Sequence, residues 1–425
     1  MGKDRFVRYL LCGFVIAGII WSAGCFPKGR ESDVTELPFK EVVERITALR
    51  FDSSDPIEVT DGRAVELFKK CLLEAKEVSA PDKSDMRTRT VTLRLGSRWM
   101  AEPLSFSYDD LGNPSYVTWR DTCYEVPGYF WPMADAVRMY QPDSFDIDQA
   151  DLEFLEEYDW VPFFLISETT VDLPPAWIHR PGEFPEVIYW AWNNELSKDI
   201  GLDLTPYLGK TVEARLYKTV KNLPEIVGTN GVFGRVVVIR SEGKIIGAWL
   251  DLGRHFCFAC SLKGCTLEDV TGKDFDEWVT VLIDPNDPME QRLSALTPEQ
   301  ILETYYSAID QKDYATAHAC ESRRYQLMYI ASNMDNRRLY NDGFGEKRGA
   351  GLANFLSVKL VNIERKEEFE RPEIGYGNAR CYLVSVEQQR RIQAGGPDGR
   401  SGYFVVMKQE TPETGWRIYG IGTGP

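Results

Sequence analysis

The sequence predicts an α+β protein in which three small α+β domains follow an N-terminal signal or anchor segment. Apolar residues recur at helical spacing in several stretches, and short runs that alternate between apolar and polar residues, typical of strands, follow them. The chain has 425 residues, of which 43% are hydrophobic and 12% aromatic. This suffices for about three domains of ~150 residues, each with its own core.

The first 24 residues have the pattern of a signal peptide or membrane anchor. Basic residues at Lys3, Arg5 and Arg8 precede an almost uncharged run from Tyr9 to Cys25. Short flanking segments rich in Lys and Arg resist translocation and stay on the cytoplasmic side of a membrane. We therefore expect every residue after 25 to lie on the outer side.

A short motif at the end of this run indicates how the chain is held. Ser22-Ala23-Gly24-Cys25 resembles the lipobox at which bacterial signal peptidase cleaves and the cysteine is diacylated. The resemblance implies lipid attachment at Cys25 and a location at the outer face of the bacterial cytoplasmic membrane. Ser22 departs from the pattern, which usually has an aliphatic residue at that position. An uncleaved N-terminal transmembrane helix over Phe6–Gly24 stays the alternative, because a helix needs ~20 residues to span a bilayer.

The net charge limits the expected partners, and the cysteine count bears on whether disulfides are present. The chain has 49 basic and 65 acidic residues, a formal net charge of −16. Such a chain repels nucleic acid and anionic lipid, so neither is expected as a partner. Of the nine cysteines, Cys12 lies in the apolar run and Cys25 is the lipidation candidate. The other seven are an odd number, which favours unpaired thiols over a disulfide framework.

Residues 25–145 are expected to form the first α+β domain. Asp61-Gly62 precedes an apolar stripe at helical spacing that runs to Leu72. Strands are predicted at 89–95, 104–108 and 116–119. Between Asp143 and Asp159 the chain then has eight acidic residues and no basic one. We interpret this segment as a solvated connector and place the first boundary near residue 150.

Residues 160–285 are expected to form a second α+β domain that contains a hairpin. Bulky residues recur every four positions between 185 and 200, which predicts a helix that stops at Gly201. Strands are predicted at 211–217, 235–240 and 245–250, the last two joined by a turn at 241–244.

Three segments of this second domain resemble a known family. The quoted residues are Tyr189-Trp190-Ala191-Trp192-Asn193-Asn194-Glu195-Leu196-Ser197-Lys198-Asp199-Ile200, Gly247-Ala248-Trp249 with Gly253-Arg254-His255, and Thr271-Gly272-Lys273-Asp274-Phe275-Asp276-Glu277-Trp278. Over about residues 185–285 they resemble an uncharacterised, membrane-anchored, lipoprotein-like family of Gram-positive bacteria. The resemblance implies a location and an architecture, and no chemistry.

Residues 295–425 are expected to form the third domain. Two prolines and two acidic residues at 284–288 predict an exposed linker, and Thr297-Pro298-Glu299-Gln300 is a capping box that starts a helix. Strands are predicted at 355–363, 379–386, 403–409 and 416–421.

The third domain also carries a resemblance. Helices followed by a meander of strands, with Tyr305-Tyr306, Lys312-Asp313-Tyr314-Ala315 and Gly415-Trp416-Arg417-Ile418, resemble a nuclear transport factor 2-like domain of unknown function. The resemblance implies a cone-shaped fold in which helices lie on a curved antiparallel sheet. Side chains that could line such a cone are Tyr305, Tyr306, His318 and Tyr382.

Few residue patterns point to chemistry. The chain has three histidines, no Gly-x-Ser-x-Gly elbow and no phosphate loop, so we predict no catalytic residue. Imidazole and thiolates at short spacing can converge on zinc, and the weak candidates are His255, Cys257, Cys260 and Cys265. The second pair of closely spaced ligands that a structural zinc site usually has is missing, and the flanking residues are apolar. We therefore expect neither a metal nor a cofactor.

The pattern as a whole favours an extracytoplasmic lipoprotein of the cell envelope that binds a partner without catalysing a reaction. The expected partners are the membrane, through the N-terminal lipid or helix, and a protein, peptide or cell-wall component. The alternative is a pocket enzyme or small-ligand binder that uses the cone of the third domain.

Overall fold

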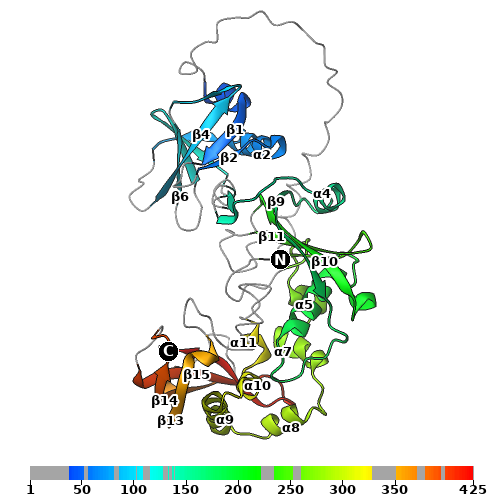
Figure 1. Ribbon diagram of the computed structural model, residues 1–425, viewed down its shortest axis with the longest axis vertical. Coiled ribbons are helices and arrows are strands. Elements are labelled where there is room, and N and C mark those ends of the chain that lie inside the picture. Colours follow the sequence, from blue (N-terminus) through cyan, green and yellow to red (C-terminus); the bar gives the residue numbers. More distant parts are fainter. Residues whose placement is uncertain are drawn as a thin grey trace, which may run out of the picture.

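A computed structural model describes most of the chain between residues 38 and 424. The stretches outside it are residues 1–37, 52–55, 81–85, 102, 109–114, 128–132, 134–135, 138, 222–233, 252–259, 328–350, 371–378, 394–397 and 425. The signal or anchor, the lipidation candidate Cys25 and the metal candidates His255 and Cys257 therefore lie outside the described residues. Within them, helices combine with three antiparallel sheets, which confirms the α+β class. The sheets follow one another along the long axis of the molecule (Figure 1).

The first sheet has eight strands, with the order β2-β1-β4-β6-β7-β8-β3 and β5 paired to β4. Their bounds are β1 Ile46–Phe51, β2 Ile57–Val59, β3 Lys76–Val78, β4 Arg87–Leu95, β5 Arg98–Trp99, β6 Leu104–Tyr108, β7 Ser115–Trp119 and β8 Thr122–Val126. Helix α2 (Gly62–Leu73) packs on β1, helix α1 (Phe39–Glu44) packs on α2, and the Asp61 side chain caps α2. The helix predicted after Asp61 is thus confirmed, whereas β1, β2, β3, β8 and α1 were not predicted.

The acidic segment before the second sheet is more than a solvated connector. It contains helix α4 (Gln149–Glu156), and the side chain of Asp151 is fully buried. Asp151 accepts hydrogen bonds from Tyr217 at 2.5 Å and from Arg215 at 3.1 Å. Arg240 lies 3.0 Å from its other oxygen. The interpretation as a connector was wrong here, because two arginines on the sheet neutralise the acidic helix that packs on them.

The second sheet has the order β12-β11-β10-β9. Its strands are β9 Pro162–Asp172, β10 Thr211–Thr219, β11 Arg235–Ser241 and β12 Lys244–Asp251. The predicted turn between β11 and β12 is confirmed, since Glu242 and Gly243 both have positive φ. Helix α5 (Glu186–Lys198) lies against β12, and Tyr189, Trp190 and Trp249 form an edge-to-face aromatic cluster between them.

The third sheet has the order β13-β14-β15-β16, a simple meander. Its strands are β13 Phe355–Arg365, β14 Arg380–Arg390, β15 Gly399–Gln409 and β16 Trp416–Gly422. Helix α9 (Pro298–Gln311) packs on β13 and β16, and α10 (Tyr314–Ala319) packs on α9. The predicted capping box is present: Thr297 accepts from the Gln300 N–H, and Gln300 accepts from the Thr297 N–H.

Short helices connect the second sheet to the third. They are α6 Leu267–Thr271, α7 Phe275–Trp278, α8 Pro288–Ser294 and α11 Arg323–Gln326. Helix α8 was not predicted. It follows the Pro285–Asp287 turn and buries Leu293 in the same apolar cluster as α9 and the third sheet.

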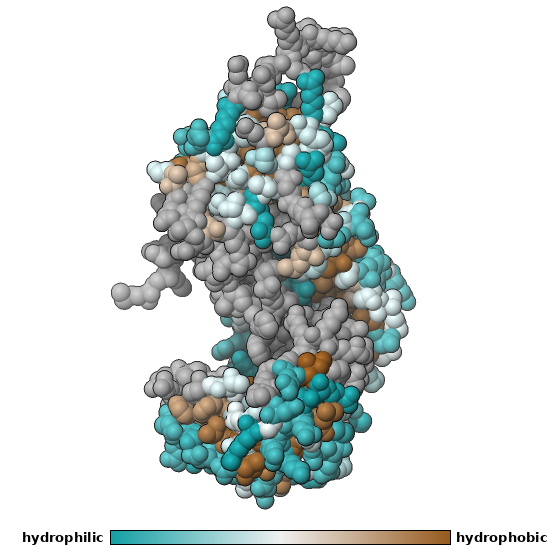
Figure 2. Space-filling model, turned by 60° about the vertical axis from the view of Figure 1, so that its left-hand side comes forward, coloured by the Kyte–Doolittle hydropathy of each residue, from teal (hydrophilic) through white to brown (hydrophobic). Residues whose placement is uncertain are grey.

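Two apolar clusters cross between neighbouring sheets. Phe163 and Phe164 of β9 belong to the core of the first sheet, where Phe163 contacts Phe68 edge to face. Leu327, just after α11, packs with Ile188, Phe275 and other residues of the second unit. Hydrophilic residues cover most of the visible described surface, and apolar residues show in small separate patches (Figure 2). In the described part of the chain, no helix is long and apolar enough to cross a membrane.

Candidate functional site

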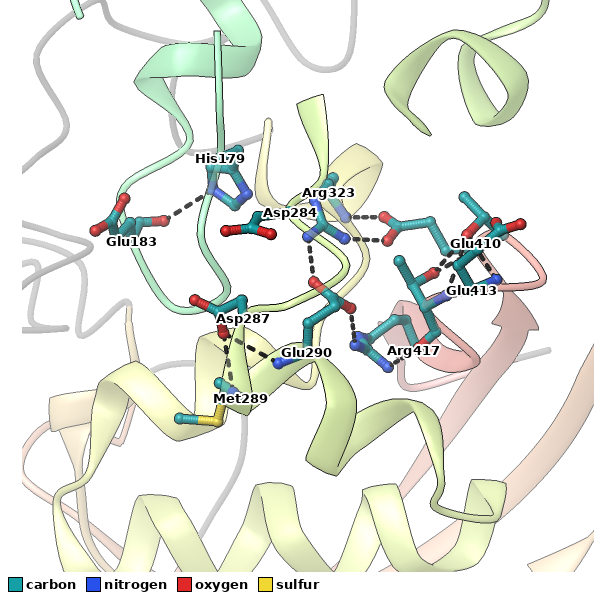
Figure 3. Close-up of polar contacts among 12 residues, drawn as sticks. His179, Glu183, Asp284, Asp287, Met289, Glu290, Arg323, Glu410, Glu413 and Arg417 are labelled. Atoms are coloured by element: carbon teal, nitrogen blue, oxygen red, sulfur yellow. Dashed lines mark hydrogen bonds and ion pairs between the residues drawn. The ribbon is translucent and has the colours of Figure 1, made fainter. Parts of the chain in front are cut away.

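The densest set of buried charges lies where α8, α11 and the β15–β16 turn meet (Figure 3). Arg323 donates from Nη2 to Glu290 and from Nη1 to Glu410, both at 2.5 Å. Arg417 donates from Nη2 to the second oxygen of Glu290, also at 2.5 Å. All four residues are at most 3% exposed. Two arginines and two glutamates therefore form a neutral, buried chain of ion pairs.

Local structure places each of these carboxylates. The Asp287 side chain accepts from the backbone N–H groups of Met289 and Glu290 and so caps α8, which turns Glu290 inward (Figure 3). Glu410 directly follows β15 and precedes a turn held by hydrogen bonds between Thr411 and Thr414. Capping and turn chemistry of this kind is set by the local sequence.

The pKa values of the two arginines depend on the balance between burial and the neighbouring carboxylates. Burial opposes ionisation of Arg323, but the carboxylates of Glu410 and Glu290 outweigh it and raise the pKa of Arg323. For Arg417 burial prevails over its contact with Glu290, and the pKa of Arg417 is lowered. Each of the four charges is paired with an opposite charge inside the protein, so the ion pairs tie α8, α11 and the β15–β16 turn together.

His179 lies beside these buried ion pairs, on the segment that follows β9 (Figure 3). It is 1% exposed, its Nε2 is 3.2 Å from the Glu183 carbonyl oxygen, and its backbone N–H donates to Leu282. Burial, and then the positive charge of Arg323, lower the pKa of His179 to about 3. The imidazole is therefore neutral at physiological pH and serves as a structural group.

A second polar contact joins α7 to the third sheet. The Asp276 carboxylate accepts from Lys408 on β15 and from Tyr419 on β16. Burial and the hydrogen bond to Asp276 raise the pKa of Tyr419. This contact adds a polar element to the junction between the second and third sheets, where Leu327 packs on Phe275.

The predicted pocket residues lie in the core of the third sheet. Tyr305, Tyr306 and Tyr382 are 4%, 3% and 0% exposed and belong to one apolar cluster. The Tyr382 hydroxyl donates to Glu299 at 2.7 Å. Burial and this hydrogen bond raise the pKa of Tyr382 to about 12. The three tyrosines lie in this one cluster as packed core side chains.

His318, the fourth pocket candidate, lies at the end of α10 in a different setting. Its Nδ1 is 2.8 Å from a Glu321 carboxylate oxygen, and both side chains are 1% exposed. Gln326 donates to the backbone oxygens of both residues, which locks the local turn. A carboxylate that orients a histidine is an arrangement found in acid–base sites, and here it is buried.

Only two of the four metal candidates fall within the described residues. Cys260 is 1% exposed in the apolar cluster under α4, and burial raises the pKa of its thiol to about 12. Burial and then the nearby Asp199 raise the pKa of Cys265. Across the described residues, no group of three or more His, Cys, Asp or Glu side chains is placed to hold a metal ion. A thiol that resists ionisation is a poor metal ligand.

Comparison with protein families finds two matches. Residues 154–250 match a domain of unknown function (DUF4830), and residues 299–422 match another domain of unknown function (DUF4829). The matches are consistent with an uncharacterised family. No curated protein and no solved structure matches the chain. The two matched segments coincide with the second and third sheets and their helices.

Lys218 is a buried charge that the sequence analysis did not single out. Lys218 on β10 is 1% exposed, and its Nζ donates to the carbonyl oxygens of Thr219 at 3.1 Å and Gly234 at 2.9 Å. Burial, with a smaller contribution from Arg235, lowers the pKa of Lys218 to about 7. The signal for this site was weak, because one lysine in an alternating strand usually points to solvent.

Proposed function

We propose that the chain is an extracytoplasmic lipoprotein of the cell envelope that works as a non-catalytic binding module. Its partner in this proposal is a protein, a peptide or a cell-wall component, and Cys25 carries the lipid. The basic start, the apolar run and the Ser22–Cys25 motif support the location. An uncleaved helix would leave the same parts of the chain on the same side of the membrane.

The observation that carries the binding role is the filled core of the third sheet. Tyr305 and Tyr306 of α9 and Tyr382 of β14, which a pocket enzyme would direct into a cavity, are packed in the apolar core between α9 and the sheet. The finer architecture also belongs to the proposal: three units at 25–145, 160–285 and 295–425, the last with the cone of a nuclear transport factor 2-like domain. The position of α8 supports moving the start of the last unit towards residue 288.

Exposed apolar side chains at one end of the third sheet support a contact surface there. Leu356 is 50% exposed and Ile392 is 38% exposed. Asn354 hydrogen-bonds to both backbone groups of Ile392, so these residues lie at the same end of the β13–β14 pair. Exposed apolar side chains that lie close together on a surface are typical of interaction sites.

Cross-linking in intact cells tests the binding role. A photoreactive residue at position 356 of the anchored chain should give a discrete adduct of higher mass. The same residue at position 281 is the control, because Val281 is 59% exposed on a different element. No adduct at position 356, or the same adducts at both positions, would contradict a specific contact surface there.

Labelling with palmitate tests the anchor. The wild-type chain should incorporate label, and Cys25→Ser should lose the label and leave the membrane. An unlabelled chain that stays in the membrane would identify the apolar run as an uncleaved helix.

A second candidate function rests on the His318–Glu321 pair. A buried histidine oriented by a carboxylate is the arrangement that a pocket enzyme in the third unit would use as a general base. A turnover that His318→Gln abolishes, with unchanged unfolding temperature, would favour the enzyme over the binding module.

A further inference from the structure

A pocket lies where α2 of the first unit faces the start of β9 and the end of β10. Its volume is about 160 Å³, and it is half open to solvent. Four apolar side chains form its walls, namely Leu67, Cys71, Val161 and Val220. An apolar cavity of about 150 Å³ accepts a molecule the size of benzene, so this pocket fits a single ring or a chain of about six carbons.

The walls of the pocket are held by contacts that do not depend on a ligand. The Arg63 guanidinium on α2 donates to the carbonyl oxygens of Pro162 and Phe163 on β9 and to that of Phe145. Phe68 of α2 and Phe163 of β9 also stack edge to face, with ring centroids 5.5 Å apart. Preformed pockets between packed units are common positions for small-molecule sites.

Charged groups surround the pocket, and their balance is positive. Lys70 and Lys221 line it together with Asp159. The Lys221 ammonium is held by the Asp159 carboxylate and by its backbone oxygen at 3.1 Å, and it lies 5.4 Å from the centre of the Trp160 ring. Lys70 is exposed and forms no ion pair with any described residue. Two ammonium groups against one carboxylate attract an anion, although the whole chain has a net charge of −16.

We propose that this pocket binds a small organic anion with one apolar ring or a short apolar chain. The apolar part lies against Leu67, Cys71 and Val220, and the carboxylate or similar acid group lies next to the ammonium of Lys70. Lys221 completes the positive edge, and its pairing with Asp159 fixes its position. The site is independent of the proposed partner surface on β13.

Ligand-observed NMR with the full-length chain in lipid nanodiscs tests this site. The probes are phenylacetate, the neutral 2-phenylethanol and the cationic phenethylamine, which share one ring and differ in charge. A ligand of about ten non-hydrogen atoms should bind in the millimolar range or tighter. Phenylacetate should bind at least about five-fold more tightly than phenethylamine, with the alcohol between them.

Three variants locate the binding. Lys70→Glu should weaken phenylacetate binding by about five-fold or more, and Leu67→Trp, which fills the pocket, should abolish binding of all three probes. Lys69→Glu is the matched control: it makes the same charge change one residue away, on a side chain that pairs with Glu66. Lys69→Glu should leave binding unchanged, and circular dichroism should show that each variant is folded.

Two results would overturn the proposal. Equal binding of the three probes, with Lys70→Glu acting no differently from Lys69→Glu, would contradict anion recognition. Absence of phenylacetate binding to the folded wild-type chain would show that the pocket is a packing gap between α2 and β9.

Discussion

Arg323 contacts both carboxylate oxygens of Glu410, although the two residues are 87 positions apart in the chain. The Arg323 backbone N–H donates to one oxygen and Nη1 donates to the other, each at 2.5 Å. Both residues are at most 3% exposed, so this buried contact joins the start of α11 directly to the residue after β15. A buried pair of this kind costs little when complete and much when one partner is removed.

Glu410→Ala should therefore destabilise the protein strongly. The substitution leaves a buried guanidinium and a buried N–H without their acceptor, which costs about 3–5 kcal/mol of unfolding free energy. Glu413→Ala is the control, since Glu413 is exposed on the same turn, and should change stability by no more than about 0.5 kcal/mol. Urea unfolding followed by tryptophan fluorescence measures both. Equal effects would mean that the buried pair contributes nothing specific.

A fragment of residues 284–425 should be more stable than one of residues 291–425. Both keep the capping box at Thr297, but only the longer one keeps Glu290, which pairs with Arg323 and Arg417. We expect a difference of about 3 kcal/mol or more, measured by thermal melting. Glu290→Ala in the longer fragment should remove the difference. If the two fragments melt alike, α8 does not belong to this unit.

Lys218→Met should change how stability depends on pH. The folded pKa of about 7 lies below the ordinary value of 10.5, so between these pH values the unfolded chain binds a proton that the folded chain does not. Stability contributed by this group therefore rises with pH, by up to about 1.4 kcal/mol per unit, and is lowest below pH 7. The variant should lose this slope and gain more stability at pH 7 than at pH 10. Urea titrations at several pH values measure it, and parallel curves for variant and wild type would contradict it.

His179→Gln should make the protein less sensitive to acid. Burial lowers the folded pKa of His179 to about 3 from the ordinary 6.5, so the unfolded chain binds the extra proton between these values. Stability from this group is then lost as pH falls from about 6.5 to about 3. Between pH 7 and acid pH, the variant should lose less unfolding free energy than the wild type loses. Urea unfolding at several pH values measures this loss. An identical acid shift in both proteins would show that other groups set the transition.

Purified protein should contain almost no metal. Within the described part of the cluster, the Cys260 thiol is buried with a pKa of about 12 and stays protonated at neutral pH. Elemental analysis measures the zinc content. About one zinc per chain, lost in Cys257→Ser, would establish a metal site formed by His255, Cys257, Cys260 and Cys265.

The α+β class and the elements with local signals could be predicted from the amino-acid sequence. The helix after Asp61, the capping box at Thr297 and the turn at Glu242–Gly243 were predicted where the structure has them, because each depends on residues within one turn of the chain. Strands β4, β6, β7, β10 to β13 and β16 were predicted within about two residues of their bounds, because runs of apolar residues mark strands locally. Strands β14 and β15 extend four residues beyond the prediction, to Arg390 and from Gly399.

Which charges are buried follows from the tertiary fold. Asp151, Glu290 and Arg323 are buried against partners at least 33 positions away in the chain. The buried Lys218 ammonium is held by the carbonyl oxygens of Thr219 and Gly234. The pocket between α2, β9 and β10 is likewise formed by three segments, residues 67–71, 159–161 and 220–221, which are about 60 to 90 positions apart along the chain. The physical reason is that burial of a charge depends on whether an opposite charge or a carbonyl arrives from elsewhere in the fold, and no local pattern specifies that.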